Sequence, residues 1–151
     1  MTNSPSNLPR AGSVAQCNEK VREQARRIIM ERGLTGAANN TQWNELIDFM
    51  RARSGWTPLW REKSVDGSIY GWDWDWFYHL PFLFVGVEWF DIGLVQEIHR
   101  GRLLSPELID HGDWILPKLA EIGFDFERRG DIVRIWGYLP RCTLDFPPAK
   151  S

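Results

Sequence analysis

The chain has 151 residues and a formal net charge of −2; 43% of its residues are hydrophobic and 25% are charged. A chain of this length and composition can bury the core of one globular domain, which excludes an intrinsically disordered protein. The near-zero charge argues against binding polyanions over the whole surface, so nucleic acid is not an expected partner. No apolar run approaches the roughly 18 residues of a membrane span, and the N-terminal residues lack the apolar centre of a secretory signal. We therefore expect no membrane contact and a cytoplasmic location.

Two helices are predicted in the first third of the chain, after a flexible arm over residues 1–17 that is rich in Ser, Asn and Pro. The first helix begins near Asn18 and ends at Gly33. The second begins near Thr41, with Asn40 or Thr41 as its cap. Its apolar stripe at helical spacing consists of Trp43, Leu46, Ile47 and Met50.

Three strands in short succession are predicted next, because residues 56–94 are rich in aromatic and β-branched side chains. Strands near 58–64 and 69–80 flank the dipeptide Asp66-Gly67, which is typical of a hairpin turn. A third strand near 84–92 would complete an antiparallel meander.

A helix beginning at Ser105 is predicted from the sequence Ser-Pro-Glu, which places a cap, a proline and an acid in favoured positions. Its buried stripe would consist of Leu108, Ile115, Leu119 and Ile122. Two last strands, near 124–129 and 131–138, would form a C-terminal hairpin, and residues 146–151 an extended tail. The predicted fold class is therefore α+β. A single antiparallel sheet, made of the meander and the hairpin, would carry helices over one face, in one domain over residues 18–145.

The most unusual stretch is the aromatic run from Tyr70 to His79. On a strand, Tyr70, Trp72, Trp74, Trp76 and Tyr78 would share one face, and Asp73, Asp75, Phe77 and His79 the other. The sequence leaves open which face is buried. Because tryptophan rows can stack on sugars or nucleobases, a small-ligand binding module is one alternative. A small enzyme using Asp73, Asp75 and His79 for acid–base chemistry is another.

Charge is unevenly distributed along the chain. Residues 64–125 contain three Lys or Arg and eleven Asp or Glu, a balance of −8. Such a region favours a basic protein as partner, because its field would steer a positively charged surface toward it. Acids on neighbouring strands with aromatic anchors beside them make up the predicted partner-binding residues: Asp73, Asp75, Glu88, Asp91, Trp74, Tyr78 and His79.

The sequence holds no constellation typical of catalysis or of metal binding. Cys17 and Cys142 lie far apart and outside any Cys/His cluster, so two isolated reduced thiols are expected. The three histidines lack ligand spacing, and glycine-rich phosphate loops and hydrolase motifs are absent. We therefore predict no metal, no cofactor and no enzymatic activity.

Several short motifs resemble a family of small uncharacterised bacterial proteins, a domain of unknown function. The motifs are Asn39-Asn40-Thr41-Gln42-Trp43, Asp75-Trp76-Phe77-Tyr78-His79, Val87-Glu88-Trp89 and the segment from Gly130 to Tyr138. The resemblance spans residues 39–139, which makes residues 18–38 a helical extension of the core. It implies no catalytic residues. Small proteins of this kind resemble immunity proteins, so the resemblance implies a cytoplasmic protein that binds an antagonistic bacterial toxin and occludes its active site. The oligomeric state stays open.

Overall fold

The computed structural model describes residues 8–13 and 18–149, so much of the predicted N-terminal arm, with Cys17, lies outside the described residues. In chain order the elements are α1 (Asn18–Arg32), β1 (Thr35–Gly36), α2 (Asn40–Arg51), β2 (Trp60–Ser64), β3 (Ile69–Asp73), the 3-10 helix η2 (Phe84–Gly86), β4 (Val87–Gly93), β5 (Val95–Ile98), β6 (Glu107–Asp110), α3 (Gly112–Ile122), β7 (Phe126–Arg129), β8 (Ile132–Trp136) and β9 (Tyr138–Leu139). Over the described ranges, no helix combines the length and the apolar character needed to cross a membrane.

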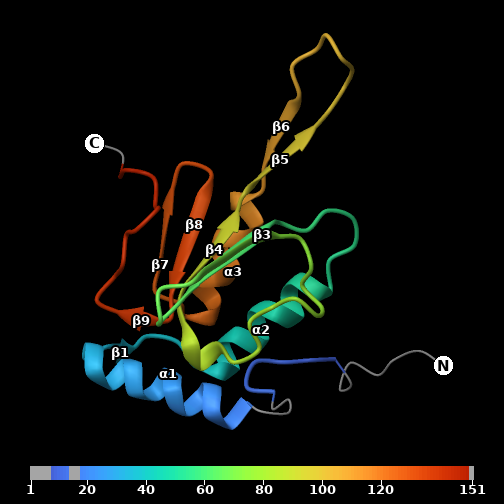
Figure 1. The fold of residues 1–151 in the computed structure, drawn as a ribbon. Coiled ribbons are helices and arrows are strands. Elements are labelled where there is room, and N and C mark those ends of the chain that lie inside the picture. Colours follow the sequence, from blue (N-terminus) through green and yellow to red (C-terminus); the bar gives the residue numbers. More distant parts are fainter. Residues whose placement is uncertain (1–7, 14–17, 150–151) are drawn as a thin grey trace, which may run out of the picture.

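The strands form three antiparallel sheets rather than one. The main sheet has five strands in the order β3-β2-β4-β8-β7, and β1–β9 and β5–β6 form two-stranded sheets. The prediction of a single sheet built from a three-strand meander and a hairpin is therefore wrong. After the edge strand β3, the long segment 74–86 carries the chain back past β2, so β2 rather than β3 lies beside β4. The β5–β6 hairpin stands away from the main sheet (Figure 1).

The helix that was predicted to begin at Ser105 begins at Gly112 instead. Residues Glu107–Asp110 form β6 and pair with Val95–Ile98, and Leu108 is exposed on this hairpin. The Ser-Pro-Glu pattern therefore precedes a strand. Residues 107–110 form hydrogen bonds with β5, and a local sequence pattern carries no information about such a distant partner. The rest of the predicted stripe is confirmed, since Ile115, Leu119 and Ile122 are buried.

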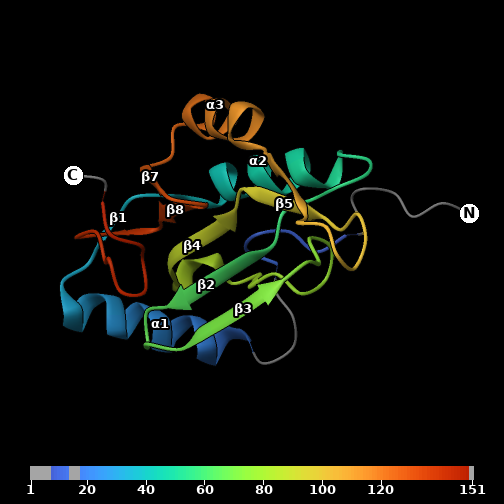
Figure 2. The same ribbon diagram turned by 90° about the horizontal axis from the view of Figure 1, so that it is seen from above.

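The main core lies between one face of the five-stranded sheet and the helices α2 and α3 (Figure 2). Asn39 caps α2 through a capping box with Gln42, and the four apolar residues of the predicted stripe are all buried. Trp43 packs on Phe84 and Phe124, with ring centroids 4.9 and 5.0 Å apart. Helix α1 lies apart from α2 and α3 and contacts η2. This packing fixes the sheet on which the candidate site is built.

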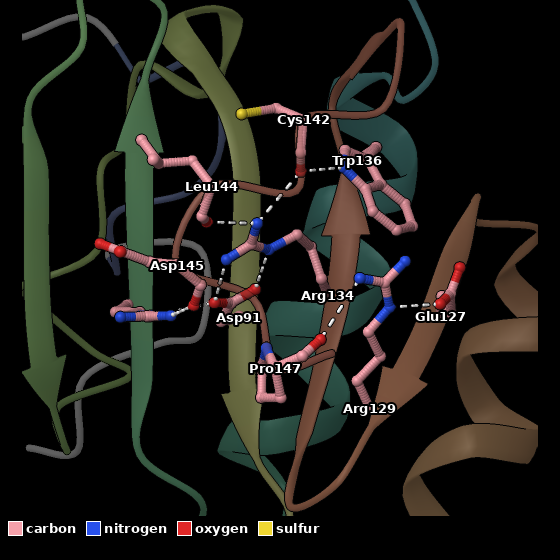
Figure 3. Close-up of polar contacts among 10 residues, drawn as sticks. Asp91, Glu127, Arg129, Arg134, Trp136, Cys142, Leu144, Asp145 and Pro147 are labelled. Carbon is pink, nitrogen blue, oxygen red and sulfur yellow. Dashed lines mark hydrogen bonds and ion pairs between the residues drawn. The ribbon is translucent and has the colours of Figure 1, made fainter. Parts of the chain in front are cut away.

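The opposite face of the sheet is covered by the C-terminal segment, residues 140–147. Trp89 of β4 and Trp136 of β8 pack there with Phe146 in a second, smaller core. Arg134 donates hydrogen bonds to the carbonyl oxygens of Cys142 and Leu144, at 3.0 and 2.7 Å, and so holds the segment on the sheet (Figure 3). Both faces of the central strands are therefore buried.

Candidate functional site

An exposed group of aromatic side chains lies on and beside the edge strand β3. We define the aromatic surface as Tyr70, Trp72, Trp74, Phe77 and Tyr78, all of which are exposed. Trp74 keeps 69% of its surface and Tyr78 59%. The predicted row of tryptophans on one strand face is wrong, because β3 ends at Asp73. Beyond that residue the alternation is lost, and Trp76 is buried while Trp74 faces solvent.

Two carboxylates shape the loop that follows β3. Asp73 accepts a hydrogen bond from the Asp75 backbone N–H at 2.8 Å. Asp75 in turn accepts from the backbone N–H groups of Phe77 and Tyr78, at 2.6 and 2.9 Å. Short acidic side chains stabilise such turns because they satisfy backbone donors that have no partner in a strand or helix. Asp73 and Asp75 therefore hold the loop, and their oxygens are largely engaged within it.

Buried tryptophans and an arginine fix the same loop from beneath. Trp76 donates from Nε1 to the Pro58 carbonyl at 2.9 Å, and Trp60 Nε1 donates to the Asp75 carbonyl at 2.9 Å. Arg51 of α2 donates to the carbonyl oxygens of Trp76 and Phe77, at 2.8 and 2.9 Å. The exposed aromatic side chains thus stand on a backbone that is hydrogen-bonded to both β2 and α2.

His79 lies between the two carboxylates, half exposed. Its Nδ1 is 2.9 Å from Asp73 Oδ2, and its Nε2 is 3.5 Å from Asp75 Oδ2. The Tyr70 hydroxyl donates to Asp73 Oδ2 at 2.7 Å. Burial raises the pKa of Asp73, but the hydrogen bonds from Asp75 N–H, Tyr70 and His79 outweigh it, so the pKa lies below its usual value. The structure thus brings together Asp73, Asp75 and His79, in an arrangement that can hold or transfer a proton.

Two other predicted partner-binding residues, Glu88 and Asp91, are 1% and 0% exposed. Glu88 binds Arg32 of α1 at 2.7 Å and Lys63 of β2 at 2.6 Å. Burial raises the pKa of Glu88, but the hydrogen bonds from Arg32 and Lys63 bring it below its usual value. Both carboxylates stabilise the fold from within and are closed to a partner.

Asp91 of β4 is engaged by two arginines from neighbouring strands. Arg134 of β8 binds it through two hydrogen bonds, at 2.7 and 2.9 Å, and Arg61 of β2 through one at 2.9 Å. The registers of β4 with β2 and with β8 place Asp91 directly opposite Arg61 and Arg134. Figure 3 shows the pair of Asp91 and Arg134 beneath the C-terminal segment.

The acidic balance of residues 64–125 does not form one acidic surface. Four of its acids pair with cations from outside that range: Glu88 with Arg32 and Lys63, Asp91 with Arg61 and Arg134, Asp110 with Arg128, and Asp125 with Arg141. In the folded protein, cations from other segments therefore neutralise part of the negative charge of residues 64–125. Among the described residues, no group of three or more His, Cys, Asp or Glu is arranged to hold a metal ion.

The sequence did not reveal a groove between the main sheet and the β5–β6 hairpin. It has a volume of about 420 Å³. Its walls include Trp56, Leu59, Trp72 and Leu108, and its polar lining includes Gln96, Glu97 and Asp131. One signal in the sequence could have revealed the hairpin that forms a wall of this groove. Val95–Ile98 and Glu107–Asp110 each combine polar residues with β-branched ones, as is typical of two paired strands.

No curated protein and no solved structure matches the chain. A family model does match, over residues 25–142, which include the second half of α1 and all of the strands from β1 to β9. The chain therefore belongs to a family of unknown function, DUF6678.

Proposed function

We propose that this protein acts by binding a partner protein through the aromatic surface, as a cytoplasmic immunity protein that occludes an antagonistic toxin. The observation that carries the proposal is the exposure of five aromatic side chains, two on β3 and three on the following loop, whose backbone is fixed at several points. Exposed large aromatic side chains that are close together in the chain support a site of association. The immunity role itself rests on the family resemblance of the aromatic motifs.

The aromatic surface has the properties of a binding hot spot. Tryptophan and tyrosine dominate hot spots because they contribute large contact areas with few rotatable bonds. The hydrogen bonds of Asp73, Asp75 and Arg51 hold the loop before any partner arrives, which lowers the ordering entropy lost on binding. The basic character proposed for the partner rests on the acids of residues 64–125 that remain outside the four internal pairings, Asp66 and Asp113 among them.

The test is a pull-down from the native host with the full chain as bait, and with a Trp74→Ala/Tyr78→Ala variant in parallel. The partner lost with the variant is then purified, and its affinity for each single variant is measured by calorimetry. Trp74→Ala should weaken binding at least about tenfold, as expected for a hot-spot residue. The matched control is Met30→Ala, which removes an apolar side chain that is 83% exposed on α1. Unchanged affinity of both aromatic variants would overturn the proposal.

The cluster of His79, Asp73 and Asp75 supports a second candidate, acid–base catalysis. An aspartate that binds one nitrogen of a histidine can orient the ring and stabilise its protonated form. Here, however, both ring nitrogens face a carboxylate, and Asp75 already accepts two backbone hydrogen bonds. A His79→Gln variant separates the candidates, because it should abolish turnover of any substrate found and leave partner affinity within about threefold.

A further inference from the structure

The β5–β6 hairpin projects from the body of the protein as an arm (Figure 1). We define the arm as residues 95–110. Its strands pair only with each other among the described residues, so each has an outer edge without a strand beside it. The hydrogen bond from His111 N–H to the Leu94 carbonyl closes its base at 2.8 Å. At about 3.3 Å per residue, the four residues of β5 extend roughly 13 Å, and residues 99–106 form the tip beyond them.

The tip of the arm is apolar and basic at once. Leu103 is 99% exposed and Leu104 62% exposed, and Arg100 and Arg102 stand beside them in the sequence. Arg100 donates to the Ser105 carbonyl, which leaves its charge uncompensated, and Arg102 forms no ion pair within residues 8–13 and 18–149. A leucine with nearly its whole surface in water gains free energy only by contact with another apolar surface.

The groove at the base of the arm has the opposite character. Trp56, Leu59, Trp72 and Leu108 offer apolar walls, and Glu97 and Asp131 add two carboxylates without an ion pair in the described part of the chain. The walls are fixed in place, because Trp56 stacks on His111 with ring centroids 4.1 Å apart, and His111 Nε2 lies 2.8 Å from Gln96 Oε1. The groove is thus a preformed site for a segment that carries both leucine and arginine.

We propose that the groove takes the arm tip of a second copy of this chain. The groove includes Val95, Gln96, Glu97 and Leu108, which belong to the base of the arm itself. If two arms lie side by side and antiparallel about a two-fold axis, the tip of each reaches the base of the other. Both copies then use the same surfaces, so the contact closes as a dimer and does not propagate.

The charges of the tip and the groove, and the exposed edges of the two strands, support the same antiparallel dimer. The tip brings Arg100 and Arg102 to a groove with Glu97 and Asp131, so opposite charges meet at each of two equivalent junctions. The exposed edges of β5 and β6 can also hydrogen-bond along the antiparallel arms. This inference shares only Trp72 with the aromatic surface of the proposed function, and its tests change residues of the arm that lie outside that surface.

The first test is sedimentation equilibrium of the full chain and of a Leu103→Asp/Leu104→Asp variant, with thermal unfolding to check the fold. The wild-type chain should dimerise in the micromolar range, and high salt should weaken the dimer because the junctions are charged. At a concentration where both proteins are monomeric, the tip variant should keep the wild-type melting temperature, since both leucines are exposed. It should raise the dimer dissociation constant at least tenfold. A wild-type chain that stays monomeric at millimolar concentration overturns the inference, as does a tip variant that still dimerises.

A charge exchange makes the test specific to this geometry. Arg102→Glu alone places like charges at both junctions, and so does Glu97→Arg alone, so each variant should be a monomer. An equimolar mixture of the two should dimerise again, because both junctions of the mixed dimer then join opposite charges. The matched control is a mixture of Arg102→Glu with Glu121→Arg, an exposed acid on α3 outside both junctions. The Glu121→Arg chains should dimerise with one another as the wild type does, while the Arg102→Glu chains stay monomeric and are not recruited into a mixed dimer as stable as that of the first mixture. Failure of the first mixture to dimerise would contradict the antiparallel arrangement.

Discussion

At the scale of single residues, the pair of Asp91 and Arg134 determines the chemistry of the covered sheet face. Arg134 donates to both oxygens of Asp91 and to two carbonyl oxygens of the C-terminal segment. Its guanidinium carbon also lies 3.6 Å from the centroid of the Trp89 ring. A buried arginine with these partners is satisfied, whereas the same arginine without its carboxylate would remain a buried, uncompensated charge.

Asp91→Ala should therefore lower the free energy of unfolding by about 3–5 kcal/mol, the range for removing one partner of a buried ion pair. Urea denaturation with a check for an unchanged m-value measures it. The matched control is Asp48→Ala, which removes the carboxylate from the exposed pair with Arg10 and should cost under about 1 kcal/mol. Equal losses in the two variants would show that Asp91 acts as an ordinary surface charge.

The distant ion-pair partners of Glu88 and Asp91 explain why the sequence alone did not show that these residues are buried. Glu88 and Asp91 were predicted at the surface because acids clustered on neighbouring strands would repel one another inside a sheet core unless cations faced them. Their partners Arg32 and Arg134 are 56 and 43 residues away, and only the assembled sheet and α1 bring them close. Trp74, Tyr78 and His79, by contrast, were predicted for a partner surface, and each is exposed. Their role in binding stays a prediction.

At the scale of elements, the C-terminal segment acts as the cover of a second core. Arg61, Arg129 and Arg134 donate to the carbonyl oxygens of Asp145, Pro147 and Leu144. Phe146 is the one large side chain that the segment inserts, and it packs edge-to-face on Trp136 with ring centroids 5.9 Å apart. The segment that the sequence assigned to an extended tail therefore begins with a buried anchor.

Phe146→Ala should lower the free energy of unfolding by about 3 kcal/mol, because it removes a buried aromatic ring and leaves a cavity under the segment. The measurement is urea denaturation beside Leu144→Ala, whose side chain is exposed and whose carbonyl remains available to Arg134. That control should stay within about 0.5 kcal/mol of the wild type. A Phe146→Ala variant as stable as the control would mean that the segment does not cover the sheet in solution.

Elements with a strong local pattern were predictable, and those decided by distant pairing were not. The two N-terminal helices and the Asp66-Gly67 hairpin follow from periodicity and turn chemistry, and the structure contains them. The strand predicted over 69–80 ends at Asp73, because the carboxylates of Asp73 and Asp75 bind backbone donors and turn the chain. The helix predicted from Ser105 does not form there, because Glu107–Asp110 pair with β5 as strand β6.

At the scale of the whole molecule, buried carboxylates act on stability in opposite directions as the pH changes. Glu62 lies on the main-core side of β2, opposite Phe90 of β4, and accepts a hydrogen bond from Ser64 at 3.3 Å. Burial raises its pKa to about 7. Asp73 and Glu88 have lowered pKa values, because their hydrogen bonds outweigh the effect of burial. Their contribution is present above the ordinary carboxyl range and is lost as the pH falls through their folded pKa values.

For Glu62 the change of stability with pH has the opposite sign, because its folded-state pKa is raised. The folded protein binds its proton more tightly than the unfolded chain does, so stability falls as the pH rises from the ordinary carboxyl value toward 7. The wild-type protein should therefore be most stable near pH 5, between the loss from Asp73 and Glu88 below and the loss from Glu62 above. Glu62→Gln keeps the shape and cannot ionise. It should raise the free energy of unfolding at pH 8 by up to roughly 3 kcal/mol, at 1.4 kcal/mol per pKa unit, with little effect at pH 4.

Thermal and urea unfolding between pH 4 and pH 9 compare the wild type, Glu62→Gln and the matched control Glu45→Gln, which changes an exposed carboxylate on α2. The wild type and the control should lose stability in parallel above pH 5, while the Glu62→Gln curve stays level up to pH 8. The loss of stability below pH 5 should be the same in all three proteins, because Asp73 and Glu88 are unchanged. A wild-type protein whose stability stays level between pH 5 and pH 8, as in Glu62→Gln, would contradict the prediction, because it would show that Glu62 ionises as freely in the folded protein as in the unfolded chain.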